Sequence, residues 1–283
     1  QYAEIPGMKQ GPWTDVYALA AVVYFAIMGK TPPTSVGRLL NDTYVPLVQS
    51  AAGRYSEGFL AAVDRALAVR PEERTQTVGQ LRMELGLADA PESGVEYLTR
   101  AGCTLNDNGR LLFPASLVED TLAKAARHFV LHAQDPRYDL EPWGKRSYFG
   151  TAGAAVNVVD PRTGYRESTI KDLFDIGRIV DVMEHIHFFQ RAVVPRDIPD
   201  PFEMDFNTCY AAVSSTTKHV GSSWVQPEHV EASLEMLHLI AGGEQQWRER
   251  PFVSQSNCFV VPPMKFATDA CKCLEVAVRG GMP

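Results

Sequence analysis

The sequence of 283 residues has no excess of basic charge, no long apolar run and no even set of cysteines. Its net charge of −7 argues against binding to nucleic acid or to an anionic membrane surface. The longest apolar run, residues 18–28, is too short to cross a bilayer and is interrupted by Tyr24. Five cysteines, an odd number, fit a reducing compartment better than a disulfide framework. We therefore predict a soluble cytoplasmic protein.

Both ends of the chain also lack the features of complete termini. The chain begins at Gln1 without a Met, and no charged segment of a signal peptide precedes the first apolar run. It stops at Pro283, directly after the helix-ending pair Gly280-Gly281, where another strand is expected. We expect a fragment of a longer protein.

Helical patterns fill the first ninety residues. The run DVYALAAVVYFAIM is apolar around its whole circumference, which predicts a helix buried on every side and ended by Gly29. The pattern over 57–69 predicts a second helix, with Asp64 and Arg65 turned outward. A third helix is predicted behind a Thr cap in TQTVGQLRMEL.

These residues resemble the C-terminal lobe of bacterial serine/threonine protein kinases. GPWTDVYALAAVVYFAIMGKTPP is similar to the segment with the central buried helix, although Ala20 stands where the family usually has Gly, and RALAVRPEERTQTVGQLRMEL to the last helices. The resemblance implies that Asp15 bonds the catalytic-loop backbone and Arg74 pairs with an A-P-E glutamate. The Gly-rich loop, strand Lys, H-R-D loop and D-F-G motif needed for phosphoryl transfer are absent from the sequence. We expect a helical remnant in which Asp15 and Arg74 are buried or half-buried charges without those partners.

A polar, turn-rich stretch at 90–94 predicts a linker and a domain boundary near residue 90. Beyond it, the turns at 106–109 and 160–164 predict two hairpins. Amphipathic helices are predicted over 115–135 and over 168–187. In these helices the predicted buried residues are Leu117, Leu122, Ala126, Phe129, Leu173, Ile176, Val180 and Met183, and the predicted cap is Ser168 or Thr169.

Two strand–helix units follow. Strands are predicted over 207–220 and 252–263, each followed by a helix, over 227–243 and 267–281. Consecutive units of this kind indicate parallel strands, as in a (β/α)₈ barrel or a doubly wound sheet. A barrel needs about 250 residues, so this segment is too short to close one. The buried residues predicted in the two helices are Val230, Leu234, Leu237, Ala241, Cys271, Leu274 and Val278.

The second part resembles the trimethylamine methyltransferase family, corrinoid-dependent enzymes acting on methylated and quaternary amines. The resemblance runs from LTRAGCTLNDNGRLLFP to the chain end, through VNVVDPRTGYRESTIKDLFDIGRIVD, HIHFFQRAVVPRDIPDPFEMDFNT, SSTTKHVG, MLHLIAGGEQQWRERPF and SNCFVVPPMKFATDACKCLE. It implies a TIM-type barrel preceded by helices, and methyl transfer from an amine to the Co(I) of a corrinoid on a separate small protein. Trimethylamine-specific members carry pyrrolysine later in the barrel, whereas other members use quaternary amines such as glycine betaine. The sequence leaves that choice open.

The predicted fold class is therefore α/β. Residues 91–283 form a partial TIM-type (β/α) barrel with preceding helices and hairpins. Residues 1–90 form an all-α remnant of a kinase C-terminal lobe. The expected partners are a corrinoid (cobalamin) protein and a small methylated amine, with no nucleic acid, no membrane and no cofactor or metal bound directly.

Methyl transfer by in-line displacement requires no nucleophilic side chain, but it requires a cation pocket with aromatic or carboxylate walls. Such groups lie at the carboxyl ends of barrel strands. Core packing or a loop hydrogen bond is the alternative for each candidate. The candidates after the two strands are Thr216, Thr217, Lys218, His219, Asn257, Pro262 and Pro263, with Tyr210 and Trp224 as aromatic walls. The strand register decides which of Ser254, Ser256 and Asn257 point inward.

Other groupings predict no site. His185 and His187 fall two residues apart on a predicted helix, where side chains face away from each other, and no third ligand is suitably spaced. Cys271 and Cys273 fail the same test. The loop over 197–207, with Glu203 and Asp205, is read as a solvated connection, and Cys258 as a small buried side chain.

Three functions remain open. The first is a corrinoid-dependent amine methyltransferase. The second is an interaction module derived from a serine/threonine kinase, and the third is a non-functional fusion remnant. We expect methyltransferase family identity, and we expect the present chain to be incomplete and inactive by itself.

Overall fold

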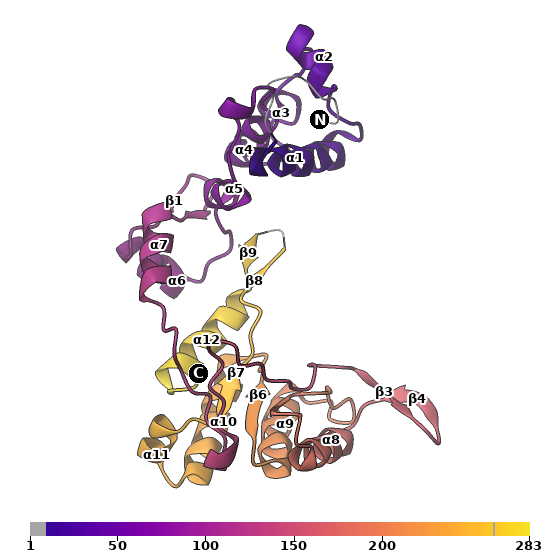
Figure 1. Ribbon diagram of the computed structural model, residues 1–283, viewed down its shortest axis with the longest axis vertical. Coiled ribbons are helices and arrows are strands. Elements are labelled where there is room, and N and C mark those ends of the chain that lie inside the picture. Colours follow the sequence, from indigo (N-terminus) through magenta and orange to yellow (C-terminus); the bar gives the residue numbers. More distant parts are fainter. Residues whose placement is uncertain (1–9, 263) are drawn as a thin grey trace. The chain divides into compact units, whose positions relative to one another are not determined.

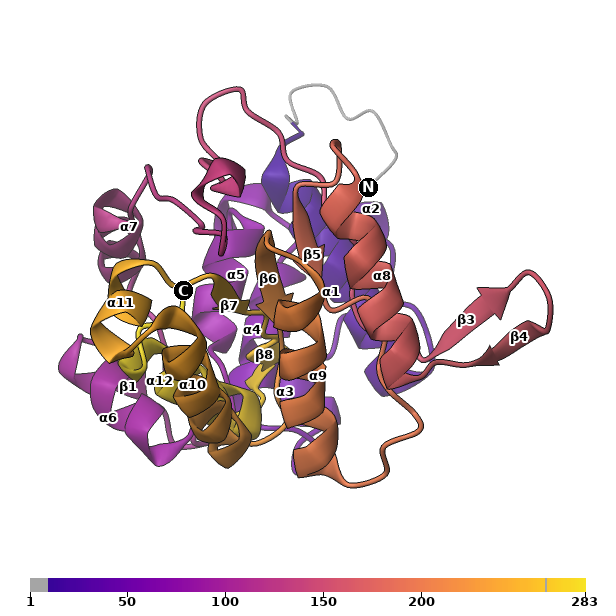
Figure 2. The same ribbon diagram turned by 90° about the horizontal axis from the view of Figure 1, so that it is seen from below.

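The computed structural model describes residues 10–262 and 264–283, which form two compact units (Figures 1 and 2). The first unit runs through Lys124 and includes Pro262–Lys265, and the second contains the remainder. Among the residues so described, no helix has the length and apolar character required to cross a membrane.

The first unit is mainly helical, as predicted. Its core contains Val16, Tyr24, Leu47, Leu60 and Leu67. Its elements are α1 (Pro12–Met28), α2 (Ser35–Leu40), α3 (Leu47–Ser50), α4 (Glu57–Ala66), a 3₁₀ turn (Pro71–Glu73), α5 (Val78–Leu85), α6 (Glu92–Arg100), the hairpin strands β1 (Thr104–Leu105) and β2 (Leu111–Leu112), and α7 (Ala115–Lys124).

Helix α1 is buried on one face only, so the predicted burial on every side is wrong. Val16 is fully buried, whereas Val22 is 66% exposed. The reason is that α1 packs against α4 and α5 but has no comparable neighbour on its other face among the described residues. The predicted end is confirmed: Gly29 adopts φ +69°, and its N–H bonds the carbonyl of Phe25.

The charged residues of this unit differ from expectation. Asp15 is exposed in the first turn of α1, so it is not a buried charge. Arg74 is half-buried, as expected, and it donates to the carbonyls of Ala68 and Val69 at 2.5 and 2.7 Å. Asp64 does not point outward, because its carboxylate accepts hydrogen bonds from two backbone N–H groups at the start of α3.

Between residue 85 and the end of the first unit, the predicted hairpin is confirmed, but the predicted linker and the predicted length of the last helix are not. The β1–β2 hairpin forms at the predicted turn. The predicted linker at 90–94 is wrong in its second half, because α6 begins at Glu92. The helix predicted over 115–135 stops at Lys124, and Leu122 and Phe129 are exposed.

The second unit alternates strands and helices. Its elements are a 3₁₀ turn (Pro136–Tyr138), β3 (Asn157–Asp160), β4 (Gly164–Glu167), α8 (Ile170–Val182), β5 (Phe188–Gln190), α9 (Pro201–Ser215), β6 (His219–Ser222), α10 (Pro227–Ala241), α11 (Glu244–Glu249), β7 (Val253–Gln255), β8 (Val260–Val261), β9 (Lys265–Phe266) and α12 (Thr268–Arg279). The predicted hairpin is confirmed as β3–β4, and β8 and β9 form another two-stranded sheet.

A three-stranded parallel sheet in the order β5-β6-β7 forms the centre of this unit, which confirms the predicted parallel pairing. Phe189, Val220 and Val253 are buried on the face covered by helices. Figure 2 shows α8 and α9 side by side along this sheet. The described strands do not close into a barrel. Because side chains alternate along a strand, the residues that flank Phe189, Val220 and Val253 point to the opposite face of the sheet.

The strand predicted over 207–220 is wrong in most of its length. Residues Pro201–Ser215 form α9, and β6 begins only at His219. The Asp200 side chain caps this helix by accepting the N–H of Glu203, and Pro201 occupies its first position. The same helix replaces much of the solvated loop expected over 197–207, where Asp205 is buried.

The predicted caps and buried faces of the remaining helices are partly confirmed. Thr169 caps α8 in a capping box with Asp172, but the helix ends at Val182 and Met183 is exposed. The buried residues of α10 are as predicted, apart from the half-buried Ala241. Helix α12 buries Cys271 as predicted, whereas Val278 is 63% exposed. Leu274, also predicted to be buried, is half-buried, and the residues that α12 contributes to the core are Cys273 and Ala277.

Candidate functional site

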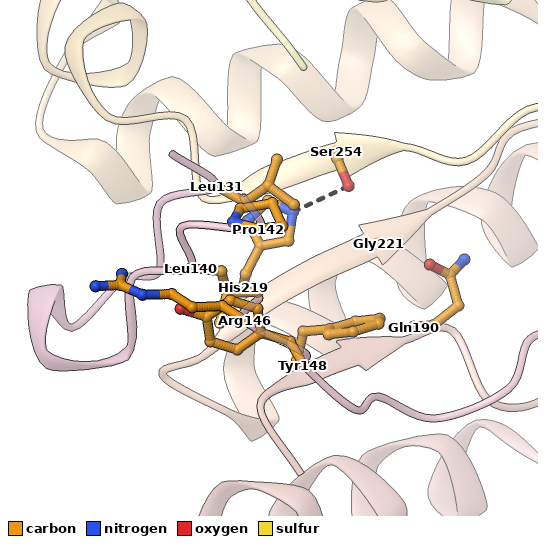
Figure 3. Close-up of a pocket in the computed structure, with 10 residues that line it drawn as sticks. Leu131, Leu140, Pro142, Arg146, Tyr148, Gln190, His219, Gly221 and Ser254 are labelled. Carbon is orange, nitrogen blue, oxygen red and sulfur yellow. Dashed lines mark hydrogen bonds between the residues drawn. The ribbon is translucent and has the colours of Figure 1, made fainter. Parts of the chain in front are cut away.

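A pocket of about 200 Å³ lies on the face of the parallel sheet that the helices do not cover (Figure 3). Strands supply part of its wall, and the preceding segment 131–148 supplies the rest. The lining residues are Leu131, Leu140, Pro142, Arg146, Tyr148, Phe188, Gln190, His219, Gly221 and Ser254. The pocket therefore combines apolar and aromatic walls with a few polar groups, the usual composition of a small-molecule site.

The period of two along each strand explains why these strand residues share the pocket. In the parallel register, Gln190 is opposite Gly221, which is in turn opposite Ser254. Gly221 leaves space for its neighbour, since an added Cβ would lie 2.0 Å from Oε1 of Gln190. The glycine therefore allows the Gln190 side chain to lie across β6.

His219 and Ser254 form a hydrogen-bonded pair inside this pocket, drawn as a dashed line in Figure 3. The Nδ1 atom of His219 lies 2.6 Å from the carbonyl oxygen of His132, which can only accept, so Nδ1 carries the proton. Burial lowers the pKa of His219 and favours the neutral ring. Its Nε2 atom therefore accepts the Ser254 hydroxyl proton, at 3.0 Å.

The segment 131–148 is held on the sheet by hydrogen bonds. Leu131 and Leu140 bond each other through both backbone groups. Asp139 accepts the Ala133 N–H and also bonds Nδ1 of His132, both at 2.9 Å. Burial opposes ionisation of Asp139, but these bonds and the Arg250 guanidinium outweigh it and hold its pKa below the ordinary value.

Two longer side chains complete the pocket. Arg146 is exposed and pairs with Glu141, so its charge is partly neutralised. The Tyr148 ring meets the His187 ring edge to face at 5.3 Å. The Tyr148 hydroxyl accepts the N–H of Glu141 at 3.3 Å. Tyr148 and Phe188 are therefore the aromatic groups available to a ligand here.

Of the sequence-predicted site residues, the structure places His219 in this pocket, together with Ser254, whose direction depended on register. Thr216, Thr217 and Lys218 lie before β6 rather than after it, at its amino end. The single strand predicted over 207–220 placed these residues at its carboxyl end. Most of that segment is α9, and the strand begins only after it.

The residues before β6 hold α8 in place. Asp181 accepts the hydroxyl protons of Thr216 and Thr217, both at 3.0 Å. Lys218 is 2% exposed, and its ammonium donates to the carbonyls of Val180, Met183 and Ile186 at 2.6–2.7 Å. Burial lowers the pKa of Lys218, and nearby Asp181 opposes that shift. These contacts satisfy carbonyls at and beyond the end of α8.

The other predicted site residues lie away from the pocket lining. Tyr210 is 55% exposed on α9. Trp224 is buried in the helix-side core, where its indole N–H donates to Ser233 at 2.8 Å. The Asn257 amide donates to the carbonyl of Ala270 at 2.6 Å. Ser256 is exposed, and Pro262 belongs to the first unit. Pro263 lies outside the described residues.

Sequence reasoning missed most of the pocket. Phe188 and Gln190 lie on β5, a strand of three residues that was not predicted and that the predicted helix over 168–187 directly precedes. Tyr148 lies outside any regular element. The apolar pair in HFFQ was the available signal, since a short apolar run after a helix is typical of a buried strand.

The residue groups for which the sequence predicted no site differ in part from their predicted surroundings. His185 and His187 lie after α8, so the predicted helical spacing is wrong for them. Asp205 is buried and bonds Nδ1 of His229 at 2.7 Å. Cys258 is exposed, contrary to expectation. Across the described ranges, His, Cys, Asp and Glu side chains form no group that could hold a metal ion.

Comparison with known proteins identifies relatives for most of the chain. The family described as trimethylamine methyltransferase (MTTB) matches residues 62–283. Trimethylamine methyltransferase MttB of Desulfitobacterium hafniense is 29% identical over 200 residues, covering 70% of this chain and 40% of the relative. MttB1 of Methanosarcina mazei is 26% identical over 210 residues, covering 72% and 42%. A glycine betaine methyltransferase of D. hafniense is 23% identical over 201 residues, covering 69% and 41%. The chain thus spans about two fifths of the length of these relatives.

One solved structure, named PpkA-294 apo form, shares 49% sequence identity over 27% of each chain. Its TM-score of 0.26 supports no conclusion about the fold. The kinase-lobe resemblance of the first ninety residues therefore stays a prediction.

Proposed function

The chain belongs to the trimethylamine methyltransferase family, and on that premise we propose that its pocket binds a methylated amine whose methyl group is passed to a corrinoid protein. The observation that carries this proposal is the pocket on the parallel sheet, with the aromatic walls of Tyr148 and Phe188.

The pocket has the chemistry required for a small organic cation. Aromatic faces attract ammonium groups through their quadrupoles, by about 0.5–2 kcal/mol. Oxygen atoms of Ser254, Gln190 and Tyr148 add neutral acceptors. Arg146, the charged residue in the lining, is exposed and paired with Glu141, which limits its repulsion of a cation.

The volume of the pocket agrees with a small substrate. A cavity of about 150 Å³ is known to hold benzene, which has six heavy atoms. The present pocket, at about 200 Å³, therefore suits a methylated amine of similar size. It does not suit a corrinoid macrocycle, which supports a corrinoid carried by a partner protein. That corrinoid supplies the nucleophile for the methyl group, and the residues of this chain bind and orient the amine.

Binding of methylated amines to the full chain tests the proposal. Isothermal titration with trimethylamine and glycine betaine is expected to show saturable binding. Replacing Tyr148 by Leu is expected to weaken it about threefold or more, because an aromatic face is lost. Tyr210→Leu is the matched control, because Tyr210 is exposed on α9 and outside the pocket. Absence of binding, or an equal loss in both variants, would refute the assignment of the pocket.

A second measurement addresses transfer. Incubation with cob(I)alamin and each amine, followed by the spectrum of methylcobalamin, reports whether this chain transfers the methyl group by itself. The expectation from the sequence is that the present chain is inactive by itself. Methylcobalamin formation that is lost in Tyr148→Leu would replace that expectation with an active enzyme.

The finer architecture is also a proposal. We propose that the parallel sheet is part of a TIM-type barrel, supported by three parallel strands in chain order with helices between them. We propose that residues 1–90 are a kinase-lobe remnant with a boundary near residue 90, and that the protein is cytoplasmic. A kinase-lobe remnant without the catalytic motifs should show no phosphate release and no phosphotransfer when the chain is incubated with radiolabelled ATP.

A further inference from the structure

Ser254 has a defined hydrogen-bonding role inside the pocket. Because the protonated Nδ1 of His219 is used by the His132 carbonyl, Nε2 of the neutral ring is an acceptor. The Ser254 hydroxyl must therefore donate to Nε2, and its proton is no longer available to a ligand. What Ser254 retains for a ligand in the pocket is the acceptor capacity of its oxygen.

The neighbouring polar groups make this acceptor distinctive. The Tyr148 hydroxyl and the Gln190 amide can both donate and accept, so neither requires a donor on the ligand. Ser254 is the middle residue of the edge strand β7, beside Gly221 of the central strand β6, and it is partly buried. A hydrogen-bond donor on a bound ligand would therefore gain most by facing Ser254.

Methylated amines divide into two chemical classes at this point. A tertiary amine is protonated at neutral pH, as alkylamines titrate near pH 10, and it carries one N–H. A quaternary ammonium ion carries none, and its methyl groups can only pack against the aromatic and aliphatic walls. The two classes carry the same charge but differ in this single donor.

We propose that the Ser254 oxygen accepts the N–H of a protonated tertiary methylamine, so that the pocket selects tertiary ammonium ions over quaternary ones. This inference rests on the proposed amine site and names its substrate class. His219 acts as a positioning residue, because it orients the Ser254 hydroxyl so that the oxygen lone pairs face the ligand.

The test compares trimethylammonium with tetramethylammonium by isothermal titration to the full chain at neutral pH. A hydrogen bond from a charged donor is expected to give trimethylammonium an advantage of about tenfold or more in Kd. Because the two ions also differ by one methyl group, the variants decide. Ser254→Ala is expected to lose the preference, with tetramethylammonium binding within about twofold of the unchanged chain.

Three further variants keep the result interpretable. Ser254→Thr retains a hydroxyl and is expected to keep the preference. Ser256→Ala, two residues along and exposed, is expected to change nothing. Gln190→Met is also expected to keep the preference, and its loss in that variant alone would overturn the assignment to Ser254. Circular dichroism melting confirms that each variant is folded.

The outcomes separate this inference from the proposed function. Equal binding of the two ions, or a preference that survives Ser254→Ala, overturns the inference while the amine site stands. Binding of neither ion overturns both. A Ser254-dependent preference without methylcobalamin formation supports the inference and limits this chain to amine binding.

Discussion

The ammonium nitrogen of Lys218 lies 2.7 Å from the carbonyl oxygen of Val180, which joins the start of β6 to the end of α8. Two more carbonyls, of Met183 and Ile186, accept from the same ammonium. A buried lysine of this kind replaces the water that would otherwise satisfy the end of a helix.

Replacing Lys218 by Met is expected to lower the free energy of unfolding by about 2–3 kcal/mol, because hydrogen bonds from a charged donor are lost and buried carbonyls remain unpaired. Urea unfolding followed by circular dichroism measures this. Lys272→Met is the control, since Lys272 is exposed on α12 and should change stability by less than about 0.5 kcal/mol. Equal effects of the two variants would contradict the capping role.

Gly177 allows α8 and α9 to approach each other closely. An added Cβ would lie 1.9 Å from Oγ and 2.6 Å from Cβ of Ser215. Gly177→Ala is therefore expected to destabilise the protein by about 1–3 kcal/mol despite the higher helix propensity of Ala. Gly79→Ala in α5 should be neutral or stabilising, because the added Cβ would lie 3.7 Å from Oγ1 of Thr77, an ordinary contact.

Removing the clashing side chain provides a second check on that contact. The double variant Gly177→Ala/Ser215→Gly is expected to lose less stability than the sum of the two single variants, because both clashing Ser215 atoms are gone. Thermal melting of the single and double variants gives the coupling. Strict additivity of the two substitutions would contradict a direct contact.

His219 predicts a specific dependence of stability on pH. Burial lowers its pKa in the folded chain, so between that value and about pH 6.5 the unfolded chain binds more protons. The stabilisation by neutral His219 is therefore complete above about pH 6.5 and is lost as the pH falls through the lowered folded-state pKa. The difference in unfolding free energy between the unchanged chain and His219→Gln should shrink from about pH 7.5 to about pH 5.5.

The exposed residue His128 serves as the control for this experiment. His128→Gln should leave the pH dependence close to that of the unchanged chain. If His219→Gln and His128→Gln have the same pH profile, the buried neutral state of His219 is not a source of stability.

Gly221→Ala tests whether the pocket volume limits ligand binding. The added methyl group meets the far end of the flexible Gln190 side chain, so the chain should remain folded, with a stability change of less than about 1 kcal/mol. The displaced side chain and the methyl group reduce the space, so affinity for trimethylammonium should fall by about threefold or more. Unchanged affinity measured by titration would exclude this part of the pocket from amine binding.

Features that depend on neighbouring residues were predictable from the sequence. The Thr169 cap with Asp172 spans three residues, and the β3–β4 hairpin closes over one turn. The apolar face of α10 follows a period of 3.6 residues. Each of these rests on contacts within a few positions of the chain, so local pattern and turn chemistry suffice to identify them.

The candidate site was only partly predictable, because its residues come together through the tertiary structure. His219 and Ser254 are 35 positions apart, and Lys218 and Val180 are 38. Which side of β7 faces the pocket depends on its register with β6, since a slip of one residue would turn Ser254 toward the helices. The sequence by itself determined the family, the helix caps and the hairpins. The tertiary structure decided that α9 is a helix and which side chains meet in the pocket, because short apolar segments take their form from the surfaces they bury.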